Sequence, residues 1–332
     1  ENWKIISVRR DKMNDNEKNY DMKMKLLYII GLWGCLSLFG CGDDDNLSPS
    51  NLDGDWYVLT DSEDPLDHLR YTVYQTYGVP VFYNDTIGSQ NRGTDYAGLP
   101  ITYYEVLNPN YSIESSSVYA KYELSYDREA ITAGVEFIRD EVLPRLVSSK
   151  LYPRSFLLVN KLTLNASPTS SYPHEECAYR GMMTSCVSLV EEIGGMTDAE
   201  IKRMACEIVA EEYTTYLMEN VSSLLEAFLN VCRAEVTSVN LYALALTSSS
   251  TPPYVDDLEE YGFLSYNKEA QYNVSSKRVT TVGERADVVD YVTEVLMEDD
   301  EAFETEYGSY EYVMKKYELM KTAMENLKAA LK

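Results

Sequence analysis

The sequence has very little histidine, with only His68 and His174 among 332 residues. Two imidazoles cannot fill a site that needs three histidine ligands, and they leave few candidates for a catalytic relay built on histidine. Positive charge is also scarce, since 29 Lys and Arg stand against 54 Asp and Glu, for a formal charge of −25. Because this excess of acid repels phosphate and no basic cluster interrupts it, we expect no nucleic-acid partner.

Several motifs that carry chemistry are absent as well. The chain has no C-x₂-C pair, G-x-S-x-G, P-loop or dinucleotide fingerprint, so the sites that these motifs build are not expected. The uncharged apolar run at residues 26–39 has 14 residues, whereas a helix that spans a bilayer needs about 20. With 45% hydrophobic residues, the chain is long enough for one large globular domain or two smaller ones.

The segment around this apolar run is typical of a secretory signal. A basic stretch, residues 22–25, precedes the run, and small residues end it. The run closes with Leu38-Phe39-Gly40-Cys41, which resembles the bacterial lipobox, whose cysteine receives the lipid and becomes the first mature residue. We therefore predict a signal peptide at residues 22–40 and a lipid anchor on Cys41. An uncleaved membrane anchor is the alternative.

Residues 1–21 come before this complete signal. We interpret them as a mis-called start, with Met22 or Met24 as the true initiator, and leave them out of the fold prediction. Without the first 40 residues, which hold 7 basic and 5 acidic side chains, the mature chain keeps 22 basic and 49 acidic ones. Its formal charge is therefore −27 over 292 residues, so the anionic character belongs to the mature protein.

An acidic run, Asp43, Asp44 and Asp45, follows the predicted anchor almost directly. In lipoproteins of the Bacteroidetes type, a run of this kind resembles the signal that sends the protein to the outer face of the outer membrane. The resemblance implies a protein held in outer-membrane lipid through Cys41 and facing the cell exterior. Residues 41–55 are acidic and rich in Ser, Asn and Gly, which is typical of a flexible tether.

Four cysteines remain once Cys35 is removed with the signal and Cys41 is lipidated. They are Cys177, Cys186, Cys206 and Cys232. In an exported protein these could pair in three ways. A bridge between the first two would clip a hairpin, and a bridge between the last two would join two helices. Free buried thiols are the alternative.

Apolar periodicity predicts the secondary structure of the mature chain. Helices are expected at residues 66–77, 128–147, 197–219, 221–236, 286–297 and 310–331. Strands are expected at residues 79–83, 156–159 and 183–190. Glycines and prolines interrupt residues 84–117, and Ser and Pro are frequent in residues 247–277, so both segments are predicted to be irregular.

These elements indicate an α+β domain at residues 56–332. Its first part, residues 56–195, mixes helices with strands, and its second part, residues 196–332, is helical. The strongest helix signal opens the second part, where Thr197 and Glu200 have the spacing of a capping box.

The order of several segments resembles a known family. Asp64-Pro65-Leu66-Asp67 follows the tether, Pro153-Arg154-Ser155-Phe156 leads into a strand, and Tyr261-Gly262-Phe263-Leu264-Ser265 comes before the helix of residues 286–297. This order is similar to the zinc-binding metallopeptidase family of Bacteroidetes, also described as substrate-import-associated zinc metallohydrolase lipoproteins. The resemblance covers most of residues 56–330. It implies a zincin-like fold with a small N-terminal sheet and a helical C-terminal half.

The defining motif of that family, H-E-x-x-H, is degenerate in this chain. The motif places two histidines one helical turn apart to bind zinc, beside a glutamate that activates the metal-bound water. Glu211 and Thr215 occupy the two histidine positions, and Glu212 occupies the position of the catalytic glutamate. A later pair, Asp287 and Asp290, resembles a family segment that we link to a further ligand. Glu211 and Asp290 could offer at most two carboxylates, which are poor ligands for zinc.

Three functions remain open. The first is a pseudoenzyme that serves a nutrient import system for glycans or peptides, with a TonB-dependent transporter and its surface binding lipoprotein as partners and no cofactor. The second is an active metallohydrolase or peptidase with an altered site, built from Glu211, Asp290 and one histidine, with zinc if the family activity is retained. The third is a structural surface protein, which predicts no cleft between residues 201–219 and 286–297.

The candidate residues also have ordinary structural explanations. Glu207, Glu211 and Glu212 have the spacing of a solvated helix face. His174 lies in a segment predicted to be a loop, and His68 lies near helix-capping aspartates, so both are expected to be ordinary surface histidines.

Overall fold

The computed structural model describes residues 55–110, 119–165, 173–236, 239–247, 258–268 and 278–332. The predicted signal peptide, Cys41 and Asp43, Asp44 and Asp45 lie outside these residues. Residues 55–332 form one unit of mixed α+β class, 50% helical and 18% strand, as the sequence predicts. Within the described ranges, no helix has both the length and the apolar composition to cross a bilayer.

Four short strands form the main sheet. They are β1 (Val81–Phe82), β5 (Phe156–Leu158), β9 (Ser185–Val187) and β8 (Ala178–Arg180), in that spatial order. The first three run parallel, and β8 pairs antiparallel with β9. All residues of the parallel strands are buried, so they show continuous burial rather than an alternating pattern, and Ser185 of β9 is their one polar residue. The three expected strands are therefore present, but each is shorter than predicted.

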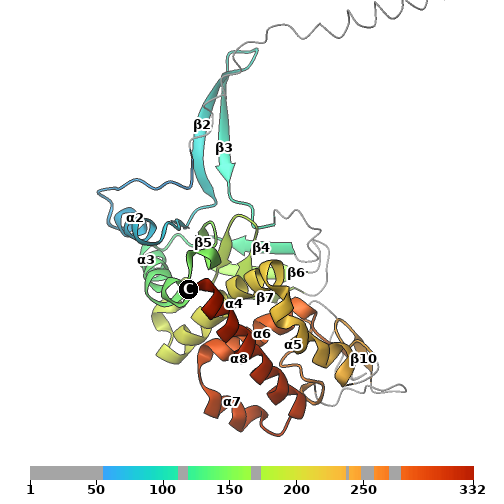
Figure 1. Cartoon of the computed structure of the whole chain (residues 1–332). Helices are drawn as coiled ribbons and strands as arrows, with labels where there is room; N and C mark the ends of the chain where they lie inside the picture. The colour runs from blue at the N-terminus through green and yellow to red at the C-terminus, as the bar shows by residue number, and fades with distance from the viewer. Residues whose placement is uncertain (1–54, 111–118, 166–172, 237–238, 248–257, 269–277) are drawn as a thin grey trace, which may run out of the picture. The chain divides into compact units, whose positions relative to one another are not determined.

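A long hairpin corrects the prediction that residues 84–117 are irregular. β2 (Thr86–Thr94) and β3 (Pro100–Val106) pair antiparallel as a two-stranded ribbon (Figure 1). The pairing shifts register between Asn91 and Thr94, where Gly93 has a φ of 98°. Gly88 and Gly93 lie at the two register shifts, and Pro100 takes the first position of β3. Glycine and proline are tolerated at such positions of a strand.

The sequence also missed two smaller sheets. β4 (Tyr119–Glu123), β6 (Lys161–Asn165) and β7 (His174–Glu175) form one, and β10 (Ala245–Thr247) pairs with β11 (Arg278–Thr280) in the other. In β6 the buried Leu162 and Leu164 alternate with polar residues, the period of a half-buried strand.

The first helix, α2 (Pro65–Tyr77), is capped by Asp64, one of the aspartates near His68. The Asp64 side chain accepts hydrogen bonds from the backbone N–H groups of Leu66 and Asp67. Gly78 ends the helix in the left-handed conformation, with a φ of 73°.

The helix predicted for residues 128–147 is interrupted. It consists of α3 (Arg128–Phe137), a π-helical turn at Ile138–Val142 and a 3-10 turn at Leu143–Arg145. Pro144 has no N–H group, so the α-helical hydrogen-bond ladder cannot continue through it. The helix therefore changes its winding over its last two turns.

Helices dominate the second half, as expected. They are α4 (Asp198–Asn220), a 3-10 turn (Ser222–Leu225), α5 (Glu226–Asn230), a π-helical turn (Val231–Glu235), a 3-10 turn (Glu259–Tyr261), α6 (Glu284–Met297), α7 (Asp300–Tyr307) and α8 (Glu311–Leu331). Two further 3-10 turns lie in the first half, at Ser149–Leu151 and Ile193–Gly195. The predicted helix 221–236 is thus three short pieces, and α7 was not predicted.

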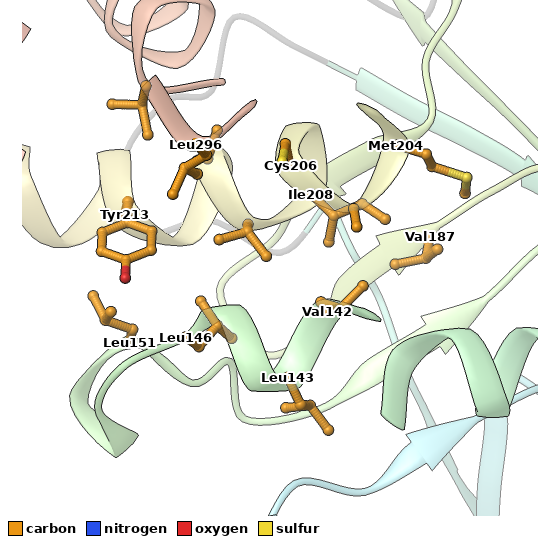
Figure 2. Close-up of a cluster of buried hydrophobic side chains, with 14 of the residues drawn as sticks. Val142, Leu143, Leu146, Leu151, Val187, Met204, Cys206, Ile208, Tyr213 and Leu296 are labelled. Carbon is orange, nitrogen blue, oxygen red and sulfur yellow. The ribbon is translucent and has the colours of Figure 1, made fainter. Parts of the chain in front are cut away.

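The core is built around α4, which is buried on most of its circumference. Thr197 and Glu200 form the predicted capping box in both directions, which fixes the start of the helix. Figure 2 shows Tyr213 and Ile208 of α4 facing Val142 and Leu146, which come from the end of the α3 segment. On another side α4 packs along α6. The helix therefore joins the sheet half to the helical half.

The four described cysteines are free thiols. Cys186, Cys206 and Cys232 are buried, and Cys177 is half-buried. Neither of the two disulfides weighed from the sequence forms, and the cysteines behave as small apolar side chains.

Gly181, in the turn between β8 and β9, allows a close backbone approach. A Cβ atom there would lie 2.6 Å from the Pro109 carbonyl oxygen and 2.9 Å from that of Thr184. We predict that Gly181→Ala lowers the free energy of unfolding by about 1–3 kcal/mol, because neither backbone oxygen can move freely. Urea denaturation measures this loss. Gly194→Ala is the matched control, since nothing lies within 4 Å of its added Cβ, and equal stability of the two variants would contradict the prediction.

Candidate functional site

A cavity of about 320 Å³ lies where α4 and α6 meet. Glu211 of α4 and Asp290 of α6 both line it. Ser265 and Lys268 line it from the segment that precedes α6, and Cys177 lines it from the start of β8. The third function weighed from the sequence, a structural protein, predicted no cleft at this place.

Half of the residues that line the cavity are charged, with acid in excess. The acidic residues are Glu176, Glu207, Glu211, Asp290 and Glu294, and the basic ones are Arg203 and Lys268. Both basic groups already have partners: Lys268 Nζ lies 2.5 Å from Glu176, and Arg203 Nη1 lies 2.6 Å from Glu294. A third carboxylate, Glu211, is paired with Arg285, so the negative field of the cavity comes from Glu207 and from the ionised form of Asp290.

The two positions that replace the motif histidines share one partner. Arg285 Nη2 donates to Glu211 Oε2 at 2.5 Å and to Thr215 Oγ1 at 3.1 Å. Thr215 Oγ1 in turn donates to the backbone carbonyl of Glu211. Glu211 lines the cavity and Thr215 does not. The structure thus pairs these two side chains with a guanidinium and does not bring Glu211, Thr215 and Asp290 together as three ligands.

Asp290 is held inside the cavity by a short hydrogen bond. Ser265 Oγ donates to Asp290 Oδ2 at 2.5 Å. Burial raises the pKa of Asp290 to about 7, although the bond from Ser265 acts in the opposite direction. A carboxyl group with this pKa can exchange a proton near neutral pH, so Asp290 is the residue of the cavity best suited to donate or accept a proton.

Glu212 lies away from the cavity and is buried, so it is not part of a solvated helix face. Its side chain is 2% exposed and does not line the cavity. It accepts a hydrogen bond from Ser185 of β9 at 2.5 Å and lies 3.0 Å from Arg180 of β8. Burial raises the pKa of Glu212 to about 7, and the Arg180 guanidinium opposes this shift. Glu212 ties α4 to the sheet and cannot activate a water in the cavity.

Asp287 likewise lies away from the cavity. It is fully buried and forms an ion pair with Lys316 of α8, with 2.6 Å between Nζ and each carboxylate oxygen. Of the Asp-x-x-Asp pair, only Asp290 reaches the cavity, since residues three apart on a helix do not point in identical directions.

The residues at the cavity do not fit a zinc ion. No group of three or more His, Cys, Asp or Glu side chains in the described part of the chain is arranged to hold a metal. Glu211 is occupied by Arg285 and Asp290 by Ser265. His174 lies in β7 with Nε2 3.7 Å from Glu176, and the exposed His68 bonds Asp61 at 2.6 Å. Neither imidazole lines the cavity, so the structure brings no histidine to Glu211 and Asp290.

Sequence reasoning did not place Ser265, Lys268 or Cys177 at the cavity. Ser265 was noted only for the order of the segments, Lys268 comes from a segment predicted to be irregular, and Cys177 was considered as a disulfide partner or a free buried thiol. Cys177 Sγ lies 3.1 Å from Glu207, and burial together with that carboxylate raises the pKa of the thiol. Ser265 and Asp290 are 25 residues apart, so no local pattern could have linked them.

A larger cavity of about 560 Å³ lies at the start of the described chain. Trp56, Tyr83 and Arg70 line it. The Arg70 guanidinium is already engaged by Asp67 at 2.7 Å and by the ring of Tyr83 at 4.8 Å. No residue of the degenerate motif reaches this cavity, so the motif points to the smaller one between α4 and α6.

The raised pKa of Glu212 predicts a pH-dependent stability. The folded pKa of about 7 exceeds the ordinary value of 4.5, so folding becomes less favourable as pH rises through this window. Glu212→Gln cannot ionise and is expected to remove about 3 kcal/mol of this decline, although it is less stable overall because Arg180 loses its counter-charge. Denaturation at a series of pH values between 4.5 and 7 measures the slope.

Glu200→Gln is the control for that experiment. The cap at Thr197 lowers the pKa of Glu200, so this variant should be less stable at neutral pH and keep the wild-type slope. A Glu212→Gln slope equal to that of the wild type would show that Glu212 does not titrate in this window.

The chain was compared with known proteins. No protein-family model, no curated protein and no solved structure matches it. A proposal about its function therefore depends on the residues at the α4–α6 cavity and on the resemblance in the sequence.

Proposed function

We propose that this chain is a surface lipoprotein with a zincin-like, metallopeptidase-like domain that has lost zinc catalysis and binds a ligand in the α4–α6 cavity. One observation carries the proposal. Where the family motif requires an imidazole facing the metal, the cavity has Glu211, and this carboxylate is paired with Arg285. A helix that still lines a cavity but supplies no metal ligand set is suited to binding rather than to metal-assisted hydrolysis.

The arrangement of α4 and α6 supports the metallopeptidase-like part of the proposal. The resemblance links the motif helix to a later acidic segment, and these segments are 74 residues or more apart in the sequence. Glu211 and Asp290, one from each segment, line the same cavity. The two segments that the resemblance links therefore each contribute a residue to one cavity.

The lining favours a polar ligand. Three of the five lining carboxylates are in ion pairs, and the other two, Glu207 and Asp290, attract cationic groups and hydrogen-bond donors, such as the amines of peptides or the hydroxyl groups of glycans. The Ser265–Asp290 pair can both donate and accept, since Asp290 titrates near neutral pH. Peptides and glycans are the two nutrient classes in the proposal.

The proposed place of action is the outer membrane. Cys41 supplies the lipid anchor, and Asp43, Asp44 and Asp45 supply the export signal to the cell exterior. A domain tethered there can deliver its ligand to a TonB-dependent transporter and to the surface binding lipoprotein of that transporter. We propose these as partners and no zinc as cofactor.

The first prediction from this proposal concerns zinc. The purified chain is incubated with zinc and then dialysed to remove the unbound metal. It should contain no stoichiometric zinc, because the cavity lacks a set of zinc ligands. Elemental analysis measures the content. One tightly held zinc per chain would overturn the proposal, and so would cleavage of a peptide or glycan that a chelator abolishes.

The second prediction concerns the cavity. Val289 of α6 is half-buried and lines it, so Val289→Trp should fill it. Ligands found by calorimetric screening of oligosaccharides and oligopeptides should then lose affinity by about tenfold or more, the effect of losing ~1.4 kcal/mol of contacts. Val147→Trp is the matched control, since Val147 is 50% exposed and lies outside the cavity. Equal affinity of the two variants would place the binding site elsewhere.

A further inference from the structure

Lys316 and Asp287 form a completely buried pair of reactive groups. Both side chains have no solvent exposure. Lys316 Nζ lies 2.6 Å from Oδ1 and 2.6 Å from Oδ2 of Asp287. Because the nitrogen is equally distant from both oxygens, it stands opposite the carboxyl carbon that they share. Neither residue lines the ligand cavity, so the pair lies outside the proposed binding site.

The surroundings keep water away from this pair. Four aromatic rings surround Lys316 Nζ, with centroids 4.6 Å away for Phe228 and Tyr291, 4.9 Å for Phe263 and 5.9 Å for Tyr242. The rings attract the ammonium form, and they also leave no solvent to stabilise the two separate charges.

Two further contacts orient the reacting groups. The Gly262 carbonyl accepts a hydrogen bond from Lys316 Nζ at 2.7 Å, which fixes one N–H direction. Tyr242 Oη donates to Asp287 Oδ2 at 2.7 Å. Burial and the Asp287 carboxylate raise the pKa of Tyr242, so this hydroxyl stays protonated and remains a donor. The Tyr242 hydroxyl is therefore placed to stabilise the negative charge that would develop on Oδ2 if Lys316 attacked the carboxyl carbon of Asp287.

Burial also favours the uncharged form of Asp287. It raises the pKa of Asp287, which favours the carboxylic acid over the carboxylate. Transfer of a proton from the ammonium to the carboxylate removes both charges from the dry interior and leaves an amine facing a carboxylic acid. Groups held in this way react with effective molarities of about 10⁵–10⁸ M when they are well oriented.

We propose that Lys316 and Asp287 condense to an intramolecular amide that joins α6 to α8. The lone pair of Nζ attacks Cγ of Asp287, a C–N bond forms, and the bond from Cγ to Oδ1 breaks. The departing hydroxyl group takes a proton from the nitrogen and leaves as one water molecule. Oδ2 remains as the amide oxygen and keeps its hydrogen bond from Tyr242. The reaction needs no oxidant, reductant or cofactor.

This bond gives the chain a covalent link that its cysteines do not provide. The four described cysteines are free thiols, so no disulfide joins the described helices. The amide would connect helices whose linked residues are 29 positions apart, and it resists both reduction and denaturation, two conditions that open disulfides or ion pairs.

Peptide mapping tests the proposal on the wild-type chain. The purified protein is reduced, denatured and digested with a protease that cleaves after glutamate, which separates residues 285–294 from residues 312–318. We expect these two peptides to be recovered joined, one water molecule lighter than their sum, with fragmentation placing the link at Asp287 and Lys316. Recovery of both peptides only in linear form would overturn the proposal, because denaturation separates an ion pair and leaves an amide intact.

Two variants control the chemistry. Lys316→Arg keeps a cationic side chain but supplies no amine that condenses under these conditions, so the joined peptide should disappear. Tyr242→Phe keeps both reacting groups and removes the donor to Oδ2, so a smaller fraction of chains should be joined. A joined product that persists in Lys316→Arg would overturn the assignment to Lys316, and an unchanged fraction in Tyr242→Phe would overturn the role of Tyr242.

Discussion

The structure depends on the packing of α4 between the sheet and the other helices. Its residues are buried on nearly every side, so the helix must pack against the sheet, the end of the α3 segment and α6 at the same time. A helix buried all round cannot turn or slide without disturbing each of these contacts. This constraint fixes where Glu211 and Glu212 point, and adjacent residues on one rigid helix therefore serve two different surroundings.

Electrostatics explains how two adjacent acidic residues of α4, Glu211 and Glu212, are accommodated. Two neighbouring carboxylates would repel each other in a dry site. Arg285 neutralises Glu211 at the cavity, and Arg180 with Ser185 satisfies Glu212 against the sheet. Each carboxylate thus has a cation of its own, and none remains to hold a metal with Asp290, whose partner is Ser265.

Buried charge recurs in the second half of the domain, where Lys316 and Asp287 face each other inside an aromatic shell. The sequence carried a signal for this site. Lys316 falls on the buried face of α8 between Val313 and Met320, and Asp287 falls on the buried face of α6 with Tyr291. A charged residue within an apolar helical stripe predicts a buried partner, but the identity of the partner depends on how α6 and α8 pack.

The sequence by itself determined the α+β class, the capped starts of α2 and α4, and the absence of an H-E-x-x-H motif, because these depend on local spacing and on residue identity. It did not reveal the β2–β3 hairpin, since glycines that mark irregular pairing resemble loop glycines in isolation. The tertiary structure alone decided the site. Glu211 and Asp290 share a cavity, Glu212 and Asp287 turn into the core, and Ser265 arrives from a distant segment, because contacts between remote residues follow from packing and not from neighbours in the chain.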